Sequence, residues 1–227
     1  IFPIAATASV SSFDQFNASL WDNNPLGLAY EVGGRLLYDS YFRNPWGYEI
    51  YTKYRNILGS FIDGSILWLD AFDSQWLTFN FGRGFMTPQT KWAGALDFGW
   101  IEDKYEIESG DTLLAGIFET NYQDIWIGRS FLLGDKSSRN NLILSARYER
   151  KKFTNRPFTD ADSNTTFHNR NIYYATIGYA KYNYYKANMI RSFGISENIP
   201  YGIQTGLTTA YLDSDFLHRT YWGLSVG

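Results

Sequence analysis

Hydrophobic and polar residues alternate with a period of two along most of the chain. In residues 46–55, one set of alternate positions is mainly aromatic or aliphatic and the other carries charges: Trp46, Tyr48, Ile50, Thr52 and Tyr54 against Glu49, Lys53 and Arg55. The same alternation recurs in residues 28–39, 91–103, 141–151, 173–179 and 218–226. Because successive side chains of a strand point to opposite faces, each segment predicts a strand with one apolar face.

Three segments depart from this alternation. Residues 62–71 carry apolar side chains on both faces, and residues 113–133 change phase near Gln123, which predicts a bulge or two strands there. Residues 154–171 are polar and turn-rich, and they predict a long, exposed extracellular loop with no apolar face to bury. The overall rhythm predicts about ten to twelve strands in one domain over residues 1–227.

Aromatic residues make up 19% of the chain, although its mean hydropathy is −0.31 and its hydrophobic content is 44%. Several of them lie at the ends of expected strands: Trp46, Trp92, Trp100, Tyr148 and Tyr179. Tyr and Trp are favoured at membrane–water interfaces. No stretch approaches the roughly 18 apolar residues of a membrane helix, and a closed barrel is the other way to satisfy every backbone group in lipid. The sequence therefore predicts an all-β fold. We expect an antiparallel transmembrane β-barrel of a bacterial outer membrane, or part of a larger one, with a soluble β-sandwich or barrel as the alternative.

Charge and composition argue against several kinds of chemistry. Lys and Arg number 20 against 23 Asp and Glu, a net charge of −3, whereas a nucleic-acid binder needs a concentrated basic face. The chain has no cysteine and two histidines, His168 and His218, which excludes thiolate chemistry and disfavours a multi-histidine metal centre. We expect no cofactor, no metal and no nucleic-acid partner, and both histidines at the surface.

Two short motifs resemble functional signatures, but their context does not fit. Residues 223–227 match G-x-S-x-G, yet the strand–turn–helix context of a nucleophile elbow is missing. Residues 160–164 resemble the start of a calcium loop, but Thr165 stands where glycine is required. We interpret these segments as a strand and a solvated loop, and we expect no catalytic residues.

Residues 19–28, Ser-Leu-Trp-Asp-Asn-Asn-Pro-Leu-Gly-Leu, precede a long alternating strand. This opening resembles that of the barrel in BamA-like proteins, the surface-antigen superfamily of outer-membrane insertases and two-partner secretion transporters. Asn24, Gly27, Gly33 and Gly34 fill places comparable to those of its N-x-x-G-x-G pattern. Residues 54–60, which include Gly59, resemble the turn after its second strand, and residues 85–94 resemble one of its periplasmic turns.

The resemblance implies a protein that helps others into or across the outer membrane, without covalent chemistry. An incoming strand would pair at a weak seam between the first and last strands, and Gly27, Gly33 and Gly34 would lower pairing stability near it. Residues 190–193 come nearest to the family's V-R-G-[FY] loop motif, so Arg191 and Phe193 would anchor a loop inside the lumen. Members of the family also have periplasmic domains before the barrel; we expect none within residues 1–227, which would be the barrel domain or a fragment of it.

The expected partners are outer-membrane lipid, client outer-membrane or secreted proteins and other envelope subunits. Two alternatives stay open. One is a porin-like or structural barrel subunit of an envelope complex. The other is a barrel enzyme that acts on lipid, for which the sequence offers no catalytic set.

Overall fold

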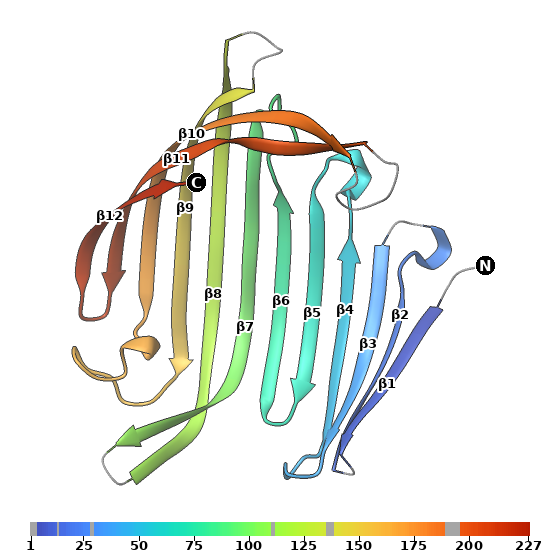
Figure 1. Ribbon diagram of the computed structural model, residues 1–227. Coiled ribbons are helices and arrows are strands. Elements are labelled where there is room, and N and C mark those ends of the chain that lie inside the picture. Colours follow the sequence, from blue (N-terminus) through green and yellow to red (C-terminus); the bar gives the residue numbers. More distant parts are fainter. Residues whose placement is uncertain (1–3, 13, 28–29, 110–111, 135–138, 189–195) are drawn as a thin grey trace.

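Twelve antiparallel strands form one sheet in the computed structural model, which describes residues 4–12, 14–27, 30–109, 112–134, 139–188 and 196–227 (Figure 1). The strands are β1 (Ile4–Ser12), β2 (Gln15–Asp22), β3 (Tyr30–Asp39), β4 (Trp46–Tyr54), β5 (Asp63–Ala71), β6 (Ser74–Arg83), β7 (Trp92–Ser109), β8 (Thr112–Leu133), β9 (Asn140–Asn155), β10 (Arg170–Asn188), β11 (Ser196–Ser214) and β12 (His218–Val226). Three short 3-10 helices lie in connections: η1 (Pro25–Gly27), η2 (Ile57–Gly59) and η3 (Thr165–Phe167).

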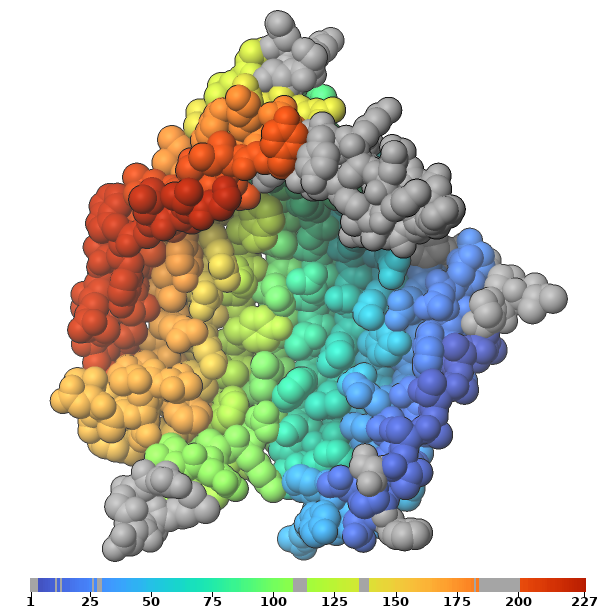
Figure 2. All heavy atoms as spheres, in the orientation of Figure 1, coloured from blue at the N-terminus to red at the C-terminus, as the bar shows by residue number. Residues whose placement is uncertain are grey.

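Each strand pairs with the next in chain order, so the topology is a continuous meander. The sheet curves strongly, and Figure 2 shows the hollow that its concave face encloses. Within the described residues, no pairing joins β1 to β12, and both are edge strands. The all-β antiparallel prediction is confirmed, with twelve strands at the upper end of the expected number.

A bulge is present in residues 113–133, as expected, although it does not lie at Gln123 and the segment is not divided into two strands. Residues 112–133 make the single strand β8, whose pairing with β7 runs unbroken through Gln123. The register shift lies on the β9 side, between Glu119 and Thr120. The sequence changes phase because the convex positions of β8 pass from the apolar Ile125 to the polar Gln123.

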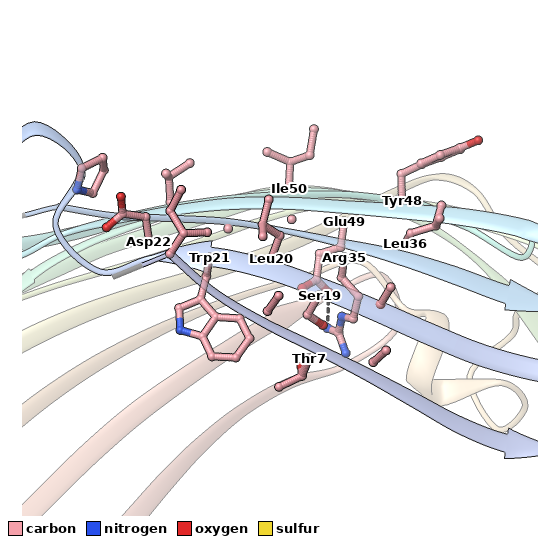
Figure 3. A pocket seen from close by; sticks show the side chains of 18 residues that line it. Thr7, Ser19, Leu20, Trp21, Asp22, Arg35, Leu36, Tyr48, Glu49 and Ile50 are labelled. Carbon is pink, nitrogen blue, oxygen red and sulfur yellow. Dashed lines mark hydrogen bonds and ion pairs between the residues drawn. The ribbon is translucent and has the colours of Figure 1, made fainter. Parts of the chain in front are cut away.

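The alternation in sequence sorts the side chains onto the two faces of the sheet. Figure 3 shows Arg35 and Glu49 pointing to the concave side of β3 and β4, while Leu36, Tyr48 and Ile50 point away from it. Convex residues remain open to the surroundings, with Leu20 56% and Ile50 55% exposed. The few well-buried apolar side chains are mostly small, so the described part of the chain has no thick core of the kind that a sandwich packs between two sheets.

The apolar region of the convex face forms a slanted band. On β3 it runs from Tyr38 to Tyr30, eight residues away, and on β10 from Tyr173 to Tyr179. One register row connects the two strands through Tyr30, Tyr54, Gly64, Phe81, Leu96, Ile125, Tyr148 and Tyr173. This row therefore forms one edge of the band on β3 and the opposite edge of the band on β10.

This slant gives an angle for the strands. A shift of about eight residues over seven strand steps, with a rise of ~3.3 Å per residue and a spacing of ~4.8 Å between strands, means a tilt of roughly 40° to the normal of the band. Strands of closed barrels tilt by about 35–45°. The tilt of this sheet lies within that range.

Candidate functional site on the concave face

Ion pairs link neighbouring strands across the concave face. On β3 and β4, Arg35 donates to Glu49 over 2.5 Å, and the Lys53 ammonium lies 3.4 Å from Glu31. Within each pair, the two residues stand directly opposite each other in the register of β3 and β4. Each of the two cations keeps about half of its side chain exposed, so the pairs line a surface that water can wet.

A larger network spans β8, β9 and β10. Arg147 makes a bidentate contact with Asp124, with Nε 2.7 Å from the carboxylate, and also lies 3.7 Å from Glu149. Glu149 in turn accepts from Arg170 at 3.2 Å and from the Tyr174 hydroxyl at 3.4 Å. Because acidic and basic side chains are paired, the described part of the concave face carries interspersed positive and negative charges and no large region of a single sign.

Tyrosine rings lie flat over glycines of the neighbouring strand on the same face. A Cβ atom added to Gly33 would fall 2.4 Å from the Tyr51 ring, which only a glycine avoids. The same arrangement recurs at two further concave pairs, Tyr122 over Gly99 and Tyr105 over Gly116. Because these glycines have no side chain, the tyrosine rings can lie against the concave surface of the sheet.

The connection between β9 and β10, residues 156–169, folds onto the concave face instead of standing free. Phe167 packs with its ring 5.5 Å from each of Tyr105, Phe118 and Phe153. His168 is 7% exposed, with Nε2 2.7 Å from the Asp160 carbonyl. The predictions of a loop without an apolar contact and of a surface histidine are therefore wrong, although Phe158 in the same loop is 81% exposed.

A carboxylate in the turn before β12 fastens this loop. Asp215 accepts from Arg156 at 2.6 Å and from the backbone N–H of Asn169 at 2.9 Å. Burial by itself raises the pKa of Asp215, but the hydrogen bonds from Arg156 and Asn169 outweigh it and leave the pKa below its usual value. The deprotonated carboxylate therefore holds the loop in place.

In residues 160–164, which resemble the start of a calcium loop, the Asp160 carboxylate binds backbone N–H groups of the same segment. Asp160 accepts from the N–H groups of Asp162 and Ser163, and these bonds lower the pKa of its carboxyl group. No group of three or more potential metal ligands exists in the described part of the chain. The carboxylate serves as a turn residue here.

The opposite end of the sheet has a second inward connection, residues 84–91 between β6 and β7. Asn141, 5% exposed, donates through Nδ2 to the Pro88 carbonyl and to the Ser130 hydroxyl, both at 2.8 Å. The Phe85 ring lies over Gly128, where a Cβ would meet it at 3.2 Å. Inward-folded connections thus stand at both ends of the concave face, and sequence reasoning found neither.

The glycines proposed near a strand seam lie in different places. Gly33 and Gly34 are in β3, paired on both sides and two strands away from the β1 edge. Gly27 and Gly59 have φ values of +73° and +76°, which suit glycine in the turns around η1 and η2. The proposed loop anchors Arg191 and Phe193 lie outside the described residues.

The two remaining motif residues are in ordinary strand surroundings. Ser225, in the G-x-S-x-G match, belongs to β12 and donates to the Gly206 carbonyl at 3.4 Å. His218 is exposed and lies 2.9 Å from Asp213 on β11. Ser225 and His218 are seven residues apart on one strand, and the pattern of a nucleophile elbow is not formed.

Comparisons with known proteins do not assign this chain to a family or a function. No family model, no curated protein and no solved structure matches the chain. In the described residues, no helix has the length and apolar character needed to cross a membrane.

Proposed function

We propose that this chain forms the wall of a β-barrel in a bacterial outer membrane and helps other proteins to insert into or cross it. The observation that carries the membrane assignment is the slanted belt. Its convex side chains are apolar and exposed, its edges are marked by aromatic residues such as Trp46 and Tyr54, and its tilt of roughly 40° fits a spanning barrel.

The assisting role is supported by the character of β1. Its central residues are small (Ala5, Ala6, Thr7, Ala8 and Ser9), so cross-strand side-chain packing with β2 is slight. Its other edge pairs with no strand among the described residues, and an extended segment of a client can add there by backbone hydrogen bonding. Client outer-membrane or secreted proteins and neighbouring envelope subunits are the partners that this edge would suit.

Membrane residence and client contact are tested separately. The protein should stay in the membrane fraction after carbonate and urea washing, and release as a stable monodisperse protein without detergent contradicts the barrel. Because the chain has no cysteine, a single one can be introduced at Ala8 on the β1 edge or at Ala146 in β9, both on the convex face. We expect disulfide capture of a cysteine-bearing client strand at position 8 and none at 146.

A porin-like conduit is the second candidate, favoured by the paired charges that line the concave face. Planar bilayers distinguish the two functions. Steady ion conductance without client capture at position 8 favours the conduit. Faster folding of a model client into liposomes, together with capture, favours the insertase.

A further inference from the structure

One region of the convex face carries two cations among apolar and aromatic side chains of the belt. Arg83 is the last residue of β6 and stands opposite Gly94 of β7, and Arg129 of β8 stands opposite Trp92 of β7. Trp92 and Trp100 mark the two edges of the belt on β7, eight residues apart. Both arginines thus lie within one residue pair of an aromatic edge of the belt, at the depth of lipid headgroups.

Neither guanidinium is neutralised by a carboxylate within the described structure. Arg129 lies 5.0 Å above the Trp92 ring and 5.0 Å from the Phe131 ring. Arg83 lies 5.7 Å above Phe61, and its Nε is buried without a hydrogen-bond partner among the described atoms. Every arginine of the concave-face network, in contrast, has an acidic partner. The ring contacts hold the two cations in position, and no carboxylate of the described residues engages their terminal N–H groups.

The turn before β5 is shaped to supply one of these rings. Phe61 adopts a left-handed backbone with φ of 59°, a conformation that costs energy for a bulky residue, and its N–H donates to the Asn56 side chain at 2.7 Å. This bond fixes the strained turn, and the turn places the Phe61 ring beneath Arg83. The backbone of this turn therefore positions the Phe61 ring that contacts the Arg83 guanidinium.

An apolar depression continues from Arg83 toward the middle of the belt, and Arg129 lies beyond Trp92 at its rim. Its floor is Gly94, where a Cβ atom would lie 2.7 Å from the Trp126 carbonyl oxygen, so that no side chain can fill it. Its walls are the side chains of Ile62, Phe81, Leu96, Ile125 and Ile127, with Arg83 and Trp92 at the mouth. A groove of this composition matches a hydrocarbon chain, and cations on either side of Trp92 match the anionic headgroup attached to it.

We infer that the groove over Gly94 binds one anionic glycerophospholipid, with an acyl chain over Gly94 and the headgroup between Arg83 and Arg129, which flank Trp92. The inference rests on the proposed membrane location. The connection 156–169, expected to be extracellular, leaves β9 at the opposite end of the sheet. The arginines would therefore face the periplasmic leaflet, where glycerophospholipids and not lipopolysaccharide are found.

Native mass spectrometry of the full chain in detergent micelles tests this site, with phosphatidylglycerol, phosphatidylcholine and lipid A as separate probes. We expect phosphatidylglycerol to be retained in preference to the other two. The Arg83→Gln/Arg129→Gln variant should lose about tenfold in retention, as expected for losing a charge-assisted hydrogen bond. The control Arg55→Gln/Arg219→Gln removes two exposed arginines outside the groove and should retain the lipid.

Two further variants separate a binding defect from a folding defect. Arg83→Lys/Arg129→Lys keeps the charge but loses the planar fork, and it should give intermediate retention. Ile127→Trp, at a position 56% exposed, should obstruct the groove and weaken retention without changing charge. Equal retention by wild type and both arginine double variants overturns the site, and preferential retention of lipid A overturns the assignment of the ligand. Since binding is measured in micelles, it is scored independently of whether carbonate washing upholds the membrane location.

Discussion

At the scale of single residues, tyrosine rings pack closely against glycines of the next strand on the concave face. Gly33 and Gly34 are neighbours in β3, yet their surroundings differ. A Cβ atom at Gly33 would overlap the Tyr51 ring, whereas at Gly34 it would lie 3.5 Å from the Glu49 carbonyl oxygen, an ordinary contact. The ring must move in the first case and nothing must move in the second.

Gly33→Ala should therefore destabilise the protein by about 1–3 kcal/mol, the usual cost of overpacking. Gly34→Ala serves as the matched control and should leave stability nearly unchanged. Urea unfolding in detergent, followed by the mobility of the unboiled band, measures both. A larger loss for Gly34→Ala than for Gly33→Ala would show that the Tyr51 contact does not set the requirement for glycine.

Adjacent residues of β9 test which face meets lipid. Leu144 is 43% exposed on the convex face, within the band that β9 crosses between Tyr148 and Leu142. Ser145 faces the concave side, opposite Gly128 and Thr176. Arginine on the lipid face costs about 2–4 kcal/mol at the bilayer midplane and less toward its edges, so Leu144→Arg should destabilise the protein more than Ser145→Arg, which faces the concave side. Equal losses in equilibrium folding into vesicles would mean that the two faces are assigned wrongly.

At the scale of elements, the connection between β9 and β10 is fixed by one ring and one carboxylate. Phe167 has three aromatic neighbours, while Phe158 in the same connection has its side chain in solvent. Phe167→Ala should release the loop at a cost of about 2 kcal/mol, since a half-buried aromatic side chain loses its contacts. Limited proteolysis should then cut within residues 156–169. Phe158→Ala should be cut no faster than wild type, and similar rates for the two variants would contradict the docking of Phe167.

The same loop should respond to acid. The folded pKa of Asp215 lies below its ordinary value of 3.8, so its stabilising effect is complete above that value and is lost as the pH falls through the lower folded pKa. Hydrogen exchange of the Asn169 amide, which donates to Asp215, should lose protection in this range after correction for intrinsic rates. Asp215→Asn should show weaker protection with no such dependence. An unchanged acid profile in that variant would assign the transition to another group.

At the scale of the whole molecule, the slanted belt makes a geometric prediction. If the convex band lies in a bilayer, the strands must tilt by roughly 40° from the membrane normal. Polarised infrared dichroism of the protein in oriented bilayers should give a tilt of about 35–45°. A protein that associates with the bilayer only at its surface would give no such preferred orientation, and this result would remove the support for a spanning barrel.

The sequence by itself determined the strands and their two faces. A period of two is a local property, so positions such as Ile50 and Glu49 are separated to opposite sides wherever the strand forms, and the twelve-stranded antiparallel sheet follows from the repeated hairpins. The polar composition of residues 154–171 likewise identified a connection, although one apolar residue in it, Phe167, was the signal that the loop docks.

Only the tertiary structure decided which distant residues meet. The curvature of the sheet brings Phe167 onto Phe118, and Phe85 onto Gly128, across separations in sequence that carry no periodic signal. Arg83 and Arg129 likewise flank Trp92 because the registers of β6, β7 and β8 align them, and a shift of one residue would send a strand's side chains to the other face. The alternation fixes a side for each residue, but strand register and curvature choose its neighbours, and the proposed lipid site consists of such neighbours.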